Sequence, residues 1–198
     1  MILQMTRPAQ GSLRHERKLE ATSNHLANVD TTGFKKDVVS FDRFFKAHLN
    51  TDFSQGHLQH TGNKLDVGLG DEGFFKVETP DGIRYTRDGS FNLNSEGVLV
   101  NQDGFSVQGN EGEITIEGNV VNINEAGEIF VDGAPVDVLD IVSFEDLNKL
   151  EKQGANLFYY DGDVQDEQVP DRVVVKQGSI EESNVNVVHE MVTMIDHH

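Results

Sequence analysis

From Lys64 onwards the chain is a succession of short apolar stretches, each followed by a turn. Within these stretches apolar and polar residues alternate, which is the pattern of a strand with one buried face. Asp-Gly dipeptides occupy several of the turns, and their glycines can adopt the positive φ of a tight hairpin. The sequence therefore predicts a mainly β fold: an antiparallel, hairpin-rich β body over residues 64–177. Discontinuous sub-domains are allowed within it, the inner one at about 106–139.

A helix is expected at each end of the chain. The first, within residues 1–30, places Leu19, Thr22 and Leu26 on one face. Its apolar stripe is thin and broken: Ala9, Leu13, Leu19 and Leu26. This helix should end at Asn28, because asparagine tolerates the left-handed conformation common at a helix C-terminus. The second helix starts within residues 178–198 and carries another stripe: Val188, Met191, Val192 and Ile195. Each helix is too narrow in its apolar face or too short to be stable alone, so the two are expected to pair in an assembled state.

Residues 31–63 are expected to connect the first helix to the β body. The connector begins with a turn that ends at Gly33, which can take a positive φ. Val38–Phe41 is predicted to be a short strand. Two apolar anchors follow it, Phe44 and Phe45.

The formal net charge of −18 is unevenly distributed. Residues 1–50 contain 8 Lys and Arg against 5 Asp and Glu, whereas the remaining residues contain 8 against 29. An acidic chain lacks the basic surface that non-specific nucleic-acid binding requires, so no nucleic-acid partner is expected. The basic N-terminal segment is electrostatically distinct, as expected for a segment that packs on something else.

Composition excludes further classes of function. The chain has no Cys, which rules out disulfides, zinc thiolate sites and thiol catalysis. It contains no apolar run of transmembrane length, and it does not open with the charged and then apolar segments of a signal peptide. Membrane insertion is therefore not expected.

Gly68–Gly73 satisfies the pattern G-x-G-x-x-G of nucleotide-binding loops. Such a loop needs a following helix whose N-terminus receives the phosphates. Here Phe74–Val77 has the character of a strand, and Asp71 and Glu72 would repel phosphate. A plain turn is the favoured interpretation.

A second motif resembles a calcium-binding loop, with four candidate ligands: Asn92, Asn94, Glu96 and Asp103. The first and third positions of the loop carry Asn, the last ligand would be Asp, and strands flank the segment. A bulged hairpin turn is therefore the favoured interpretation.

The histidines and carboxylates form no recognisable catalytic pattern. His57 and His60 could meet on a helical turn, but solvation of a polar connector is the expected explanation. His197 and His198 are either native residues at a helix end or the beginning of a tag. The sequence lacks a G-x-S-x-G elbow, and its carboxylates are scattered over turns without an apolar pocket. We therefore expect neither an enzyme nor a cofactor.

Five segments resemble, in the same order, segments of the bacterial flagellar rod and hook protein family: Asn24–Phe34, Gly70–Val77, Tyr85–Phe91, Gly97–Gly109 and Val175–Val188. Within the family, the modest β region looks most like the proximal rod subunits, with the distal rod subunits second. The first twenty residues depart from the family by lacking its usual aromatic and small-residue pattern. The last helix lacks the usual continuation, so a truncated chain is expected.

This resemblance implies a structural subunit of the flagellar basal-body rod, in the periplasm. Its implied partners are other copies of itself, neighbouring rod or hook proteins, and the flagellar type III export apparatus, which would export it without a cleaved signal. The implied assembly signature consists of Asn24, Leu26, Ala27, Asn28, Thr31, Thr32, Gly33 and Phe34. The implied packing residues of the C-terminal helix are Ser183, Asn184, Val185, Val188, Met191, Val192 and Ile195.

An alternative function of another class is an extracytoplasmic module that binds calcium or another ligand in its Asp-rich turns. A melting temperature that shifts with calcium would favour this alternative. Broken, narrow helices at the two ends favour the rod subunit, because such ends can order when neighbours supply buried area.

Overall fold

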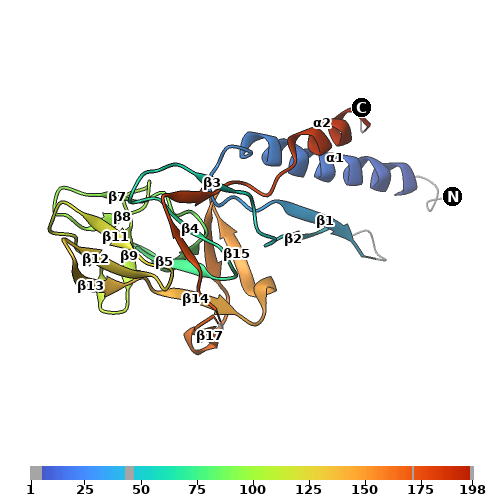
Figure 1. The fold of residues 1–198 in the computed structure, drawn as a ribbon. Coiled ribbons are helices and arrows are strands. Elements are labelled where there is room, and N and C mark those ends of the chain that lie inside the picture. The colour runs from blue at the N-terminus through green and yellow to red at the C-terminus, as the bar shows by residue number, and fades with distance from the viewer. Residues whose placement is uncertain (1–5, 43–46, 171, 197–198) are drawn as a thin grey trace.

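The computed structural model describes residues 6–42, 47–170 and 172–196. An elongated β body carries a helical arm that projects from one end (Figure 1). The two ends of the chain lie on this arm, where α1 (Thr6–Ala27) packs against α2 (Val187–Asp196). The predicted fold class, mainly antiparallel β with helices at both ends, is confirmed.

The largest sheet has ten strands in the described part of the chain. They are β5 (Phe74–Thr79), β6 (Gly82–Thr86), β7 (Asn92–Leu93), β8 (Leu99–Val100), β9 (Ser106–Gly109), β10 (Gly112–Glu113), β14 (Ile141–Phe144), β15 (Leu150–Gln153), β16 (Leu157–Tyr160) and β17 (Glu167–Gln168). Its main path runs β15-β16-β6-β5-β9-β8-β7, and β14 pairs with both β5 and β17. Every pairing is antiparallel, as the hairpin pattern predicts.

Smaller sheets complete the fold. β11 (Val121–Ile123), β12 (Glu128–Val131) and β13 (Ala134–Val138) form a three-stranded sheet. Three two-stranded sheets pair β1 (Asp37–Phe41) with β2 (Ala47–Thr51), β3 (Leu58–His60) with β19 (Ser179–Glu181), and β4 (Val67–Leu69) with β18 (Val175–Gln177). Short 3-10 helices occupy Leu147–Lys149 and Val164–Asp166. The pairing of β19 with β3 brings the C-terminal segment back to the connector, and the pairing of β18 with β4 joins the two ends of the β body beside it.

The β body has two apolar clusters, one on each face of β5. Successive residues of a strand point to opposite faces, so Phe74 and Phe75 enter different clusters. Phe75 contacts Phe91 and belongs to the cluster that includes Val77, Val107 of β9 and the buried residues of β11 and β12. Phe74 packs with an aromatic group whose members are Tyr85, Phe144, Phe158 and Tyr160. A sheet buried on both faces gives the β body a firm core onto which the arm can be attached.

Three hairpin turns of the β body share the sequence Asn-x-x-Gly and one mechanism. The side-chain Oδ1 of Asn94 accepts hydrogen bonds from the backbone N–H groups of Glu96 and Val98. Asn101 and Asn124 make the corresponding bonds in their own turns. The glycine that closes each turn has a φ between 81° and 85°. Asn94 is thus engaged in folding its turn, which agrees with the hairpin interpretation of the segment that resembles a calcium loop.

The end of α1 differs from the sequence expectation. The helix stops at Ala27, one residue before the predicted end, and Asn28 is not left-handed: among the described non-glycine residues only Asp132 has a positive φ. Instead, Asn28 Nδ2 donates to the carbonyl of Asn24 at 2.9 Å and to its side-chain Oδ1 at 2.6 Å. The positive φ is taken by Gly33, at 68°, as predicted. The helix therefore ends through side-chain bonds, and the chain reverses five residues later.

Other local predictions have mixed outcomes. The strand expected at Val38–Phe41 is confirmed as part of β1. Gly68–Gly73 is followed by strand β5 and not by a helix, which agrees with the preference for a turn over a nucleotide-binding loop, but only residues 70–72 bend, because Gly68 and Leu69 belong to strand β4. His60 lies in strand β3, so it does not meet His57 on a helical turn. Phe44, Phe45, His197 and His198 lie outside the described residues.

Candidate assembly site

The arm joins the β body at a junction of segments far apart in the sequence. We define the junction by Gly33, Lys35, Arg87, Glu181 and Asn184. It brings together the turn after α1, the connector before β3, the loop after β6, and the end of β19. The geometry of the arm relative to the β body therefore depends on these contacts.

A single buried carboxylate occupies the centre of the junction. The Glu181 side chain is fully buried, and its Oε1 lies 2.6 Å from Lys35 Nζ. Its Oε2 accepts from Arg87 Nε at 2.8 Å and lies 2.7 Å from Arg87 Nη2. The backbone N–H of Gly56 donates to Oε1 at 2.7 Å. Glu181 thus connects one cation from the turn after α1, one from the β body and the backbone of the connector.

The two cations bind backbone carbonyls with their remaining donors. Arg87 Nη1 donates to the carbonyls of Asp71 and Gly73 at 2.9 and 2.6 Å. Lys35 Nζ donates to the carbonyl of Ser54 at 2.7 Å. Burial lowers the pKa of Lys35 below 10.5, although the neighbouring Glu181 carboxylate opposes this shift. Such a network is costly to break, because removing one member leaves another charge buried without its partner.

Gly33 allows the turn after α1 to lie directly on the β body. A Cβ at this position would be 2.4 Å from the backbone nitrogen of Asp88 and 2.7 Å from the carbonyl carbon of Arg87. Its N–H donates to the backbone carbonyl of Glu181 at 2.8 Å. Only glycine satisfies both the positive φ and this contact distance.

Asn184 fixes the C-terminal segment to the N-terminal one. Its Oδ1 accepts from the backbone N–H of Lys36 at 2.8 Å. Its Nδ2 donates to the carbonyls of Asp52 and Ser54 at 2.8 and 3.1 Å. The Asn184 amide can accept and donate all of these hydrogen bonds in only one register of the two segments, which gives the junction geometric specificity.

Neighbouring signature residues support the same turn. Phe34 is buried, and its ring packs edge-on to His25 with 6.5 Å between centroids. Thr32 contacts Asp88, a buried carboxyl that also accepts from Asn156 Nδ2 at 2.8 Å. Burial raises the pKa of Asp88, and bonds from Ser90 and Thr32 oppose the shift.

His25 links α1 to both α2 and the β1–β2 hairpin. Its Nε2 accepts from the backbone N–H of Asp37 at 2.9 Å. Its Nδ1 lies 3.2 Å from the buried carboxylate of Glu190 on α2. Asp37 in turn pairs with Lys152 of β15 at 2.7 Å. The arm is therefore held by polar contacts on both sides of α1.

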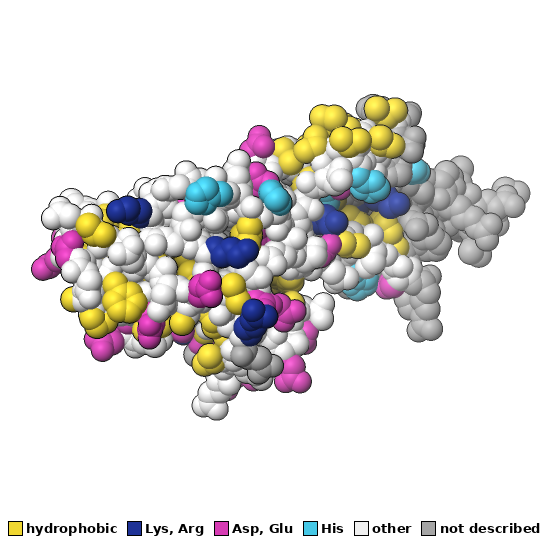
Figure 2. Space-filling model, viewed as in Figure 1, with side chains coloured by type: hydrophobic (Ala, Val, Ile, Leu, Met, Phe, Trp, Pro, Cys, Tyr) yellow, Lys and Arg dark blue, Asp and Glu magenta, His cyan; other side chains and the backbone are white. Residues whose placement is uncertain are grey.

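The apolar stripe predicted on α2 faces away from α1. The fractions of surface exposed are 71% for Val188, 52% for Met191, 51% for Val192 and 73% for Ile195. Figure 2 shows hydrophobic side chains gathered over α2 at the top of the molecule. Within one chain α2 buries Glu190 beside α1 and leaves this stripe uncovered. We name these four side chains the α2 face.

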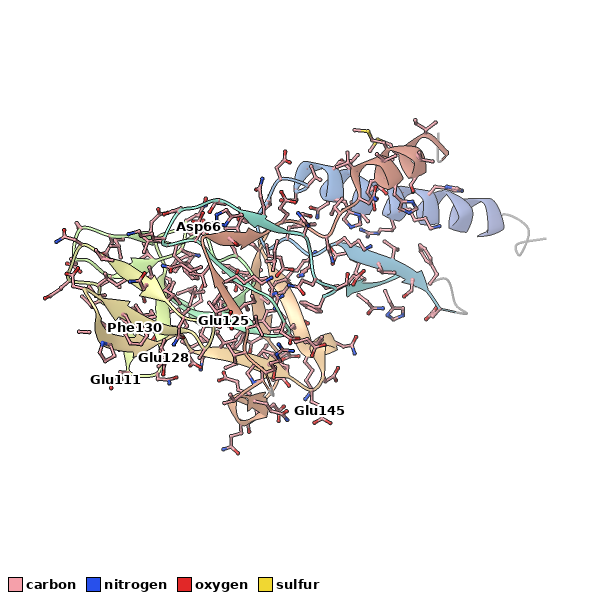
Figure 3. All side chains as sticks on the ribbon, viewed as in Figure 1. Asp66, Glu111, Glu125, Glu128, Phe130 and Glu145 are labelled. Atoms are coloured by element: carbon pink, nitrogen blue, oxygen red, sulfur yellow. The ribbon has the colours of Figure 1, made fainter. Side chains whose placement is uncertain are left out.

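The charge asymmetry of the sequence appears in space. The labelled carboxylates Glu111, Glu125, Glu128 and Glu145 all lie on the β body, away from the arm (Figure 3).

Among the described residues, no group of three or more His, Asp or Glu side chains is arranged to hold a metal ion. Neither described helix combines the length and apolar character needed to cross a bilayer.

The structure thus places the predicted site residues in three regions: the junction, the α2 face and the end of α1. Thr32, Gly33, Phe34 and Asn184 meet at or beside the junction, whereas the α2 face lies apart from it. Ser183 and Val185 flank Asn184 between β19 and α2 and are partly buried. Asn24, Ala27 and Asn28 lie at the end of α1, where Asn28 also contacts Thr31, and Leu26 is partly buried.

Sequence reasoning missed the three charged residues of the junction. Lys35, Arg87 and Glu181 all lie next to or inside segments that resemble the family, but none was singled out. A signal was present at Glu181: strand alternation places it on the same face as Ser179, and both are buried. A charged residue on the inward face of a strand indicates a buried ion pair.

Comparisons with known proteins agree with these observations. Residues 69–131 match a family model described as the flagellar hook protein FlgE/F/G D1 domain, and residues 176–198 match one described as the flagellar basal body rod FlgEFG protein C-terminal region. The chain is 32% identical to the flagellar basal-body rod protein FlgF of Caulobacter vibrioides, over 91% of this chain and 81% of that protein. It is 34% identical to the flagellar basal-body rod protein FlgG of Buchnera aphidicola, over 87% of this chain and 82% of that protein. It is also similar to FlgG of Bacillus subtilis, at 28% identity over 93% of this chain and 86% of that protein. The chain therefore belongs to the flagellar basal-body rod protein family.

Proposed function

We propose that this rod subunit joins its neighbours through its two terminal helices, and that the junction sets the direction in which these helices leave the β body. Membership of the rod family makes it a structural subunit of the flagellar basal body. The observation that carries the proposal is the α2 face, where four large apolar side chains are at least half exposed on one short helix. Such a face marks an interaction surface.

The junction would make the arm a preorganised connector. Glu181, Lys35 and Arg87 hold two segments against the β body: the one that follows α1 and the one that precedes α2. A helix that leaves a rigid junction presents its apolar face in a fixed direction, so less freedom is lost when a neighbour binds. Repeated subunits would then meet in one geometry.

The same proposal includes how the subunit acts and where. It acts without catalysis, and its buried ionisable groups at the junction serve as structural bonds. Its partners are other copies of itself and neighbouring rod or hook proteins. It reaches a periplasmic position in the rod through the flagellar export apparatus and binds no nucleic acid. A proximal position in the rod stays a prediction.

The alternative of a calcium-binding module has no observation in its favour. Asn94, one of its candidate ligands, already uses its side-chain oxygen to accept two backbone hydrogen bonds. The relatives that match carry the names of rod proteins.

Electron microscopy of basal bodies from cells that lack this protein would test the proposal. We expect rods that stop at the position of the missing subunit, and cells that do not swim. Restoring the chain should restore both. Complete rods in its absence would show that it is not a building block of the rod.

A further inference from the structure

α2 packs against α1 with its charged side inward. Among the described residues of α2, Glu190 is the buried one, at 8% exposure, whereas all four side chains of the α2 face are at least half exposed. An amphipathic helix normally does the opposite and buries its apolar side. A carboxylate is rarely buried unless a partner holds it. The rotation of α2 about its own axis therefore has a specific cause within the chain.

His25 is the partner that Glu190 meets. The imidazole is buried on α1, and its Nε2 accepts the backbone N–H of Asp37 at 2.9 Å. The proton of the ring is therefore on Nδ1, which lies 3.2 Å from Glu190 Oε2. In the described part of the chain no other group bonds to Nδ1. A buried N–H without an acceptor is costly, so α2 has to present an acceptor at this point and not an apolar side chain.

The imidazole is itself held in place from the side of the β body. Its ring packs edge-on to the buried ring of Phe34 and bonds to the backbone of Asp37. Lys152 of β15 contacts both of these residues: its Nζ lies 4.5 Å from the centroid of the Phe34 ring and 2.7 Å from Asp37 Oδ2. His25 therefore presents Nδ1 to α2 from a position that the β body determines.

The position of Glu190 determines where the α2 face points. Successive residues of an α-helix are about 100° apart around its axis, so Val188 and Val192, each two positions from Glu190, lie about 160° from it. Holding Glu190 against α1 thus turns both valines away from α1. Their exposed fractions of 71% and 51% agree with this geometry.

We propose that His25 is a positioning residue for assembly: through Glu190 it holds the charged side of α2 against α1 and keeps the α2 face free for a neighbouring subunit. The inference rests on the proposed function. Without the pair, the apolar side of α2 would turn inward and cover itself on α1, because burial of apolar surface is favourable. The chain would then lose its assembly surface by folding. Buried polar groups can specify one arrangement in this way.

Cysteine reporters test the orientation of α2, because the native sequence has no Cys. Val192→Cys reports the α2 face, and Met194→Cys, in a separate chain, reports a partly buried position on the same side as Glu190. In the dilute, purified chain a maleimide should react faster at position 192 than at position 194. We expect His25→Leu to reverse this order, with a loss of labelling at position 192 and a gain at position 194. The matched control is His25→Gln, which carries one acceptor and one donor as the neutral imidazole does, and it should keep the native order.

Two results would overturn the inference. An unchanged order with His25→Leu would mean that the segment held by Asn184, and not His25, sets the rotation of α2. Fast labelling at both positions would mean that the pair only attaches α2 to α1. The proposed function fails separately: it fails if Val188→Asp leaves rod assembly intact, whatever the labelling shows.

Discussion

Lys35 and Glu181 are separated by 146 residues in the sequence, yet their charged atoms lie 2.6 Å apart with both side chains fully buried. Lys35 follows the turn after α1, and Glu181 ends β19 shortly before α2. The pair therefore joins the two chain segments that carry the helices of the arm. Arg87 adds the β body to the same carboxylate. This small charged group therefore connects both segments of the arm to the β body.

Replacing Glu181 by Gln should strongly destabilise the subunit. The substitution keeps the size of the side chain but leaves Lys35 and Arg87 buried without their counter-charge, at a cost of roughly 3–5 kcal/mol in the free energy of unfolding. Urea denaturation measures the change. The matched control is Glu182→Gln, at the next and more exposed position, which should alter stability by less than about 0.5 kcal/mol. Equal effects of the two substitutions would show that the buried carboxylate has no special role.

Replacing Gly33 by Ala tests the close contact between the turn and the β body. With a Cβ present, the positive φ destabilises the folded chain by roughly 1–3 kcal/mol, and the Cβ would also clash with the backbone of Asp88. Gly104→Ala separates the two effects, because Gly104 has a φ of 85° and a Cβ there would meet no described atom within 4 Å. We expect Gly33→Ala to lower the melting temperature clearly more than Gly104→Ala. If both lower it equally, the contact is not tight.

The buried carboxyl of Asp88 predicts a pH dependence of stability. Because its pKa is raised in the folded chain above the ordinary 3.8, the folded state retains the proton while the unfolded state loses it. The stability contributed by Asp88 is thus complete below 3.8 and is lost as the pH rises through the folded pKa. The Asp88→Asn variant lacks this titration. The free energy of unfolding of the native chain, minus that of Asp88→Asn, should decrease between about pH 3 and about pH 7. An increase over that range would mean that the carboxylate form is the one stabilised by the fold.

The sequence predicted the elements of this fold better than the contacts between them. Alternation and Asp-Gly turns reveal the strands of the β body because the signal lies within a few neighbouring residues. The end of α1 and the positive φ of Gly33 are likewise local, although Asn28 ends the helix by side-chain bonds and not by a left-handed backbone.

The junction was less accessible, because its two ion pairs, Arg87–Glu181 and Lys35–Glu181, join residues 94 and 146 positions apart. Local patterns do not report which cation meets which carboxylate. The same limit applies to α2. Its stripe could be recognised from spacing, but only the structure shows that the stripe faces away from α1 and that Glu190 takes the inner position.

The central claim is that the α2 face assembles the rod and is not part of the subunit's own core. Val188→Asp tests it most directly, with Val169→Asp, the same change at an exposed valine of the β body, as the control. The melting temperature of the purified chain should change by less than about 2 °C in both variants. The measurement is electron microscopy of basal bodies from cells in which each variant replaces the native chain. We predict incomplete rods with Val188→Asp and complete rods with Val169→Asp; complete rods with Val188→Asp would contradict the account.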